Sequence, residues 1–203
     1  GADESLLKMK AISGGNFHGE VMGFAMDFLG IALAEVGALA ERQINRMLSG
    51  SDNQGLPPML VSSPEAAGLN SGLMMPHYTA VSLALENQTL AHPDSVHSLP
   101  TSAGQEDHNA NSLTAARHAR QIIHNVGHIL AVHFFTAAQA IDLRRAATPG
   151  AALAPATAAA HAAIRRAAAF VERDRLYRPD LERLFERVMT GEIARAAEPQ
   201  AGT

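Results

Sequence analysis

The sequence predicts an all-α protein, built from long antiparallel helices that form an oligomeric helical bundle. Apolar residues make up 47% of the 203 residues, but aromatic residues only 4%. A core of Ala, Leu, Ile and Met suits closely packed helices better than two stacked sheets. Over long stretches the apolar residues recur at steps of three and four, which is the helical period. No segment shows a convincing strand pattern.

The first predicted helix follows the turn "SGGNFHGE" at residues 13–20 and ends before the turn formers "SGSDNQG" at residues 49–55. One apolar stripe runs along its whole length and consists of Met22, Met26, Leu29, Leu33, Val36, Ala40, Ile44 and Met47. Such a stripe corresponds to about eight helical turns. A helix of this length needs neighbours along its face, because its own propensity does not stabilise it in water.

Residues 56–70 are predicted as loop, and residues 71–90 as a second helix. Pro76 lies inside that second range, either in a first helical turn or at a kink. Residues 91–111 form a long polar connection without periodicity, and connections of this length are often functional. A third long helix is predicted at residues 112–145, with Asn111 or Ser112 as its N-cap. It ends before "TPG" at residues 148–150.

The last part of the chain changes in character. Pro155 begins an alanine-rich helix that is predicted to reach residue 173, and Pro179 begins another, "PDLERLFERVMTGEI". Residues from about 196 onward are predicted to be frayed. The sequence therefore predicts two parts: residues 1–150, a central long-helix segment with the active-site loops, and residues 151–203, peripheral helices and a tail.

Composition excludes several classes of protein. The net charge is −4 and there is no basic block, so nucleic acid is not an expected partner. Without cysteine there is no disulfide framework and no thiolate metal site. Asp27, Glu35 and Glu41 interrupt the longest apolar pattern, so we expect no membrane span. We expect a cytoplasmic protein whose N-terminus, which opens with Gly1, is processed or cut.

Three groups of residues have side chains or backbone groups suited to chemistry. His124 and His128 are four residues apart on one helical face, but no carboxylate completes a set, so no metal site is predicted. "SGGNFHG" precedes a helix, where backbone N–H groups favour anions, but it has no lysine for a phosphate. "TSAGQEDHNANS" places Glu106 and Asp107 beside His108. These residues can support proton transfer, or they can form a solvated loop that caps the next helix.

Five segments, taken in order, resemble the aromatic amino acid lyase family, which comprises histidine, tyrosine and phenylalanine ammonia-lyases and related aminomutases. They are "SGGNFHGE", "AEVGALAERQINRML", "GLNSGLMM", "LENQTLAHPDSVHSLPTSAGQEDH" and "AAQAIDLR". The resemblance covers residues 12–145 and continues more weakly toward the C-terminus. It implies a mostly helical homotetramer whose long central helices bundle across subunits, as the helical patterns also suggest.

The resemblance also implies a prosthetic group, a methylidene-imidazolone (MIO) ring made autocatalytically from an Ala-Ser-Gly triplet. In the family this electrophile activates the amino acid, a base removes a β-proton, and ammonia leaves to give an α,β-unsaturated acid. The 203 residues contain no Ala-Ser-Gly triplet. We therefore expect the chain to be a C-terminal portion that is inactive alone. Its expected partners are an aromatic amino acid substrate and an N-terminal half that supplies the electrophile.

Residue by residue, the resemblance implies two principal site residues. Phe17 matches the phenylalanine beside the prosthetic ring, and Glu106 matches the active-site glutamate that contacts the substrate and assists proton handling. Gln105 is a neighbouring candidate for substrate binding. "QEDH" is similar to histidine and bacterial tyrosine enzymes, whereas phenylalanine lyases carry "NQD" there. The expected function is elimination of ammonia from L-histidine or another aromatic L-amino acid; the alternatives are an aminomutase segment and a catalytically inactive helical assembly module.

Overall fold

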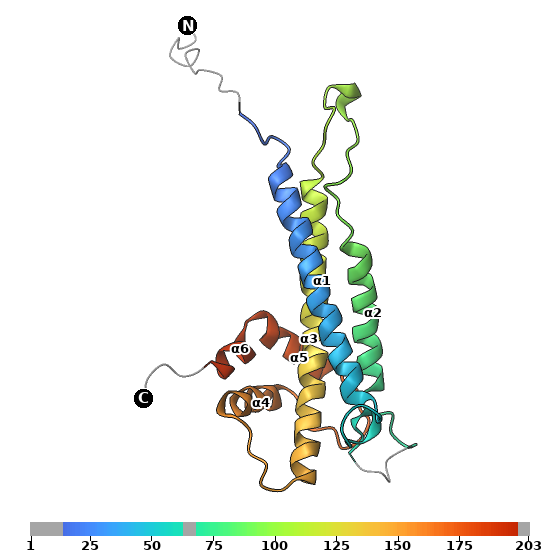
Figure 1. Cartoon of the computed structure of the whole chain (residues 1–203), viewed down its shortest axis with the longest axis vertical. Coiled ribbons are helices and arrows are strands. Elements are labelled where there is room, and N and C mark those ends of the chain that lie inside the picture. Colours follow the sequence, from blue (N-terminus) through green and yellow to red (C-terminus); the bar gives the residue numbers. More distant parts are fainter. Residues whose placement is uncertain (1–13, 63–67, 199–203) are drawn as a thin grey trace.

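Three long helices lie side by side in a computed structural model, which describes residues 14–62 and 68–198 (Figure 1). They are α1 (Glu20–Leu48), α2 (Met74–Leu90) and α3 (Ser112–Ala147). Consecutive long helices are antiparallel, so α1 and α3 run in the same direction and α2 in the opposite one. The prediction of an all-α fold is confirmed. Residues 14–62 and 68–198 contain no β-strand, and an isolated β-bridge pairs Thr101 with Glu106.

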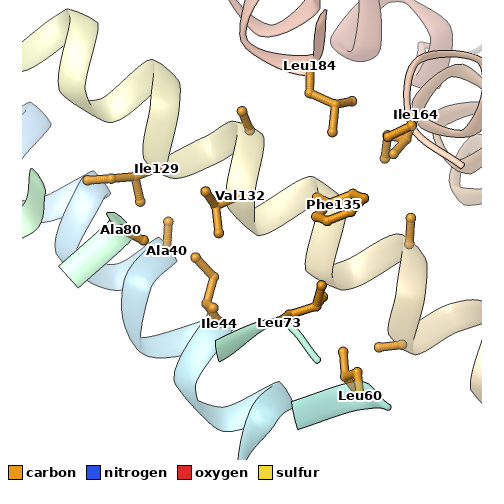
Figure 2. Packing of buried hydrophobic residues seen from close by; sticks show 14 of the residues in the cluster. Ala40, Ile44, Leu60, Leu73, Ala80, Ile129, Val132, Phe135, Ile164 and Leu184 are labelled. Atoms are coloured by element: carbon orange, nitrogen blue, oxygen red, sulfur yellow. The ribbon is translucent and has the colours of Figure 1, made fainter. Parts of the chain in front are cut away.

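Three shorter helices, α4 (Pro155–Ala167), α5 (Arg178–Met189) and α6 (Glu192–Ala197), gather on one side of α3 (Figure 1). The single-turn 3₁₀ helices η2 (Pro58–Leu60) and η4 (Ser102–Gly104) lie in the connections. Helix α3 is the centre of the core. Its Val132 and Phe135 are almost fully buried, between Ile44 of α1 on one side and Leu184 of α5 on the other (Figure 2).

Helix α1 buries only the last turns of the apolar stripe that the sequence indicates, at Ala40 and Ile44. Met22 is 58% exposed and Val36 is 45% exposed, whereas the glycines between them face α3. A Cβ on Gly30 would lie 3.2 Å from Ile122, and one on Gly37 would lie 3.2 Å from Val126. Glycine thus permits the close approach of the two helices. Other large apolar side chains of α1, among them Phe28 and Leu39, consequently lie on faces that this chain does not cover.

Helix boundaries follow the prediction closely in the first 150 residues. Helix α2 begins at Met74, three residues later than predicted, and Pro76 lies in its first turn, where it causes no kink. Helix α3 begins at Ser112 with Asn111 as the N-cap residue. The Asn111 side chain does not cap the helix, because its amide donates to the carbonyl oxygen of His97 at 2.6 Å.

The C-terminal helices are shorter than predicted. Helix α4 ends at Ala167 rather than residue 173, because the following segment is extended and bonded to Gln139 of α3. The Gln139 Oε1 accepts the N–H of Val171 at 3.0 Å, and its Nε2 donates to the Val171 carbonyl at 3.0 Å. The last predicted helix is broken at Gly191, whose φ is 71°, into α5 and α6. Helix α6 includes Ala196 and Ala197, where fraying was expected.

One cluster of buried residues joins the two predicted parts of the chain, since Ile164 and Leu184 belong to the same core as Ile44 and Phe135. The division at residue 150 stays a prediction.

By length and composition, α1 and α3 could each cross a membrane, contrary to the expectation from the sequence. Their most apolar windows have mean hydropathies of 1.6 and 1.3. About half of the α3 window is buried within the chain, but only 17% of the α1 window. Asp27 and Glu41 do interrupt α1, yet both point to the face that packs on the rest of the chain, where they have polar partners. Buried core helices of other proteins have the same length and hydropathy.

Candidate active site

The turn before α1 owes its shape to two left-handed residues. Asn16 has φ 61° and Gly19 has φ 69°, and the Gly19 N–H donates to the Asn16 carbonyl at 3.0 Å. Asparagine and glycine are the residues that adopt this backbone most readily. Gly14 and Gly15 do not adopt it. The tight entry into α1 therefore depends on Asn16 and Gly19.

The connection at residues 91–111 is an ordered loop, anchored at its start by Asp27 of α1. The Asp27 carboxylate accepts the N–H of Asp94 at 3.2 Å, and the N–H and hydroxyl of Ser95 at 2.9 and 2.6 Å. Burial alone would raise the pKa of Asp27, but the bonds from Ser95 and Asp94 outweigh it and hold the pKa below its usual value. Asp27 is thus an ionised, fully bonded anchor.

The far end of this loop is closed on itself. Thr101 and Glu106 exchange two backbone hydrogen bonds, of 2.9 and 3.2 Å, around the single turn of η4. Ser102 and Ala103 inside that turn have φ values of 54° and 56°, in the left-handed region. Strained backbone of this kind persists where the surroundings hold it, and it is frequent at functional sites. The turn fixes the main chain of Glu106.

Two histidine–carboxylate pairs join the turn before α1 to this loop. His18 Nε2 lies 2.9 Å from Glu106 Oε2, and His108 Nε2 lies 3.0 Å from Glu20 Oε2. The hydroxyl of Ser112, the first residue of α3, donates to the His18 carbonyl at 2.9 Å. The two polar segments that the sequence singles out therefore meet, although 88 residues separate the members of each pair.

Phe17 lies next to this junction and is open to its surroundings. Its side chain is 87% exposed, and its ring meets the His18 ring edge-on with the centroids 5.2 Å apart. Large exposed apolar side chains continue along the start of α1, among them Phe24 and Phe28 at 46% and 71%. The structure thus brings Phe17 and Glu106 together around His18. Gln105 is exposed at the end of η4, where its N–H donates to the Ser102 carbonyl.

The paired histidines of α3 pack against an aromatic ring. His128 stacks on Phe185 of α5 with centroids 3.9 Å apart, and His124 lies 4.8 Å from His128. Burial, followed by the nearby His124, holds the pKa of His128 below its usual value. Within residues 14–62 and 68–198, no three His, Cys, Asp or Glu side chains are grouped so as to hold a metal ion.

His18 is not singled out by the sequence, although it pairs with Glu106. A signal is present, because "HGE" at residues 18–20 and "EDH" at residues 106–108 carry complementary groups two residues apart. Two such segments can form two histidine–carboxylate pairs at once when they lie side by side and run in the same direction. The structure shows this arrangement, with His18 paired to Glu106 and His108 paired to Glu20.

Solved structures of ammonia-lyases and aminomutases share this arrangement of long helices. The sequence profile of the family described as aromatic amino acid lyase matches residues 3–166, and the chain belongs to this family.

The relatives agree with this assignment. The chain is 48% identical over 193 residues to histidine ammonia-lyase from Symbiobacterium thermophilum. The matched residues make up 95% of this chain and 36% of that enzyme. Among solved structures, it is similar to tyrosine aminomutase from Streptomyces globisporus, with a TM-score of 0.85 and 40% identity over 93% of this chain and 35% of the other. Histidine ammonia-lyase from Trypanosoma cruzi gives a TM-score of 0.84 with 33% identity, over 95% of this chain and 37% of the other. The chain thus spans about a third of the length of these relatives.

Proposed function

We propose that the chain is the C-terminal part of a histidine ammonia-lyase-like enzyme, which eliminates ammonia from L-histidine or another aromatic L-amino acid. The observation that carries the proposal is the junction of the two polar segments, where His18 contacts both the Glu106 carboxylate and the Phe17 ring. The 48% identity to a histidine ammonia-lyase supports the choice of reaction. In this proposal the product is an α,β-unsaturated acid.

The chain supplies binding and proton-handling groups to such a site. Phe17 offers a flat apolar wall for an aromatic side chain. Within the described ranges, His18 is the side chain in contact with the Glu106 carboxylate, and it contacts Oε2. The second oxygen, Oε1, is then available to the substrate, where a carboxylate can accept a proton or bind the amino group. Gln105 stands next to Glu106 as a further candidate for substrate contact.

The MIO group does not fit this chain as a covalent part of it, because no Ala-Ser-Gly triplet occurs in the 203 residues. In our proposal the group belongs to a portion of the enzyme that precedes this one, and Phe17 is exposed for contact with that portion. This chain alone is then inactive.

Aminomutase activity is the second candidate, because the tyrosine aminomutase from S. globisporus matches the fold at a TM-score of 0.85. The two reactions differ in whether ammonia is added back, so a β-amino acid among the products would select the aminomutase. The third candidate is a catalytically inactive helical assembly module. In that case the chain should give no product even when it is joined to an electrophile-bearing portion.

We further propose that the enzyme assembles as a homotetramer through the uncovered faces of its long helices. Val21, Phe28, Leu39 and Leu113 are 62%, 71%, 58% and 74% exposed, respectively. Exposed apolar surface that continues along a helix marks an interface. In this proposal α1 is a core helix of the assembly rather than a membrane span, the enzyme is cytoplasmic, and it binds neither nucleic acid nor membrane.

The substitution Glu106→Gln tests the proposed role of Glu106. It keeps the size of the side chain and removes the charge, so we expect a loss of turnover on the order of 100-fold in the complete enzyme, as is typical for a general acid–base group. The thermal unfolding midpoint should change little, because Glu106 is partly exposed. An equal loss of stability and turnover would instead assign Glu106 a structural role.

A further inference from the structure

We infer that His18 is a positioning residue that orients the Glu106 carboxylate toward the substrate. The inference rests on the proposed function of Glu106 and adds a residue that the sequence analysis did not assign. It is carried by the contact between His18 Nε2 and Glu106 Oε2, at 2.9 Å. This distance is that of a hydrogen bond, and a hydrogen bond to a carboxylate group is stronger than one between neutral groups.

His18 is itself held from two sides. Its carbonyl accepts the hydroxyl of Ser112 at 2.9 Å, so the start of α3 fixes its main chain. Its ring meets the Phe17 ring edge-on, with centroids 5.2 Å apart and planes at 90°. A hydrogen bond from a group fixed in this way restricts its partner more than a bond from a mobile side chain does. His18 therefore links the proposed aromatic wall, Phe17, to the proposed acid–base group, Glu106.

The contact also divides the two oxygens of Glu106 between two tasks. Oε2 is occupied by His18, and Oε1 is left to face a substrate. Without His18, the carboxylate gains rotational freedom about its last side-chain bonds. A displacement of about 1 Å at a reacting group can reduce the rate on the order of 100-fold. The loss of one hydrogen bond that orients this carboxylate can therefore have a large effect on turnover.

The second pair provides an internal control. His108 and Glu20 join the same two segments at 3.0 Å, with the same sequence separation, but neither touches Glu106. The His108 side chain is 60% exposed, against 30% for His18. If the pairs only tether the turn to the loop, the loss of either histidine should have a similar effect. If His18 orients Glu106, only the loss of His18 should reduce turnover strongly.

The test uses the complete enzyme, which is this chain together with the electrophile-bearing portion. Its kcat and KM are measured for the variants His18→Ala, His18→Gln, His18→Asn and His108→Ala. Gln places its amide nitrogen where His18 Nε2 lies, whereas the shorter Asn places it where Nδ1 lies. We expect kcat to fall roughly 10- to 100-fold in H18A and H18N, with KM changed less than about threefold, and H18Q and H108A to stay within about threefold of the unmodified enzyme.

Three kinetic results would overturn the inference: equal losses in H18A and H108A, a loss in H18Q as large as in H18A, or unchanged kcat in H18A. Thermal unfolding of each variant separates a folding defect from a loss of turnover. If the unmodified enzyme acts on no aromatic amino acid, the proposed function fails instead. Crystal structures of the unmodified protein and of H18A compare the position of the Glu106 carboxylate with and without His18. A carboxylate that keeps its position without His18 contradicts the inference.

Discussion

Gln139 of α3 is expected to contribute more to stability than any exposed glutamine of the chain. It is fully buried, and its amide satisfies both backbone groups of Val171, the N–H and the carbonyl, at 3.0 Å each. Val171 is 3% exposed, so water cannot replace either bond. These two bonds hold the extended segment after α4 against α3.

The substitution Gln139→Met keeps the approximate volume and removes both bonds. Each buried backbone group left without a partner costs about 1–3 kcal/mol, so the expected loss in the free energy of unfolding is about 2–6 kcal/mol. This is a large fraction of the about 5–15 kcal/mol of a typical domain. Urea unfolding of the 203-residue chain, followed by circular dichroism at a fixed protein concentration, measures it.

The matched control is Gln88→Met on the exposed face of α2, for which we expect a change within about 0.5 kcal/mol. A loss below about 1 kcal/mol for Gln139→Met, with an unchanged dependence on urea, would refute the reasoning. It would mean that Val171 is held by packing and that its backbone groups find other partners.

Two further predictions concern pH and assembly. Asp27 has a pKa below its unfolded value of about 3.9, so its stabilising effect is fully present above that pH and is lost as the pH falls through the folded pKa. Asp27→Asn should therefore destabilise the chain by about 1.5–3 kcal/mol at pH 7 and by less at pH 3, as measured by urea unfolding at both pH values. A difference that stays constant between these pH values would contradict the assigned role of Asp27. Sedimentation velocity at micromolar concentration should show an oligomer, most simply a tetramer. The reason is that the exposed apolar faces of α1 and α3 are too long for a monomer to leave uncovered. A single monomeric species would contradict the proposed assembly.

The existence and extent of the long helices could be predicted from the sequence, because apolar spacing and turn formers are local properties. The direction in which α1 faces could not. Its apolar residues surround the helix, and the face that packs on α3 is selected by Gly30 and Gly37, which permit close approach. The end of α4 also depended on a distant residue, since Gln139 captures the backbone of Val171 thirty-two residues away.

The candidate site, like the fold, could be predicted from the sequence only in part. Phe17 and Glu106 were identified by resemblance to a family, and the structure places both at one junction. His18 was not identified, because its meaning depends on a contact across 88 residues. The spacing of apolar residues carries no information about such a contact. In the sequence, the complementary order of "HGE" and "EDH" is the signal that indicates it.

The most direct test of the proposed function compares this chain alone with the chain joined to the portion of S. thermophilum histidine ammonia-lyase that it does not match. Each protein is incubated with L-histidine, L-tyrosine and L-phenylalanine, and the absorbance of the arylacrylate product is followed. We predict turnover by the joined protein and none by the 203-residue chain. Turnover by the chain alone would contradict the account, and so would a folded, joined protein that forms no arylacrylate from any of the three amino acids.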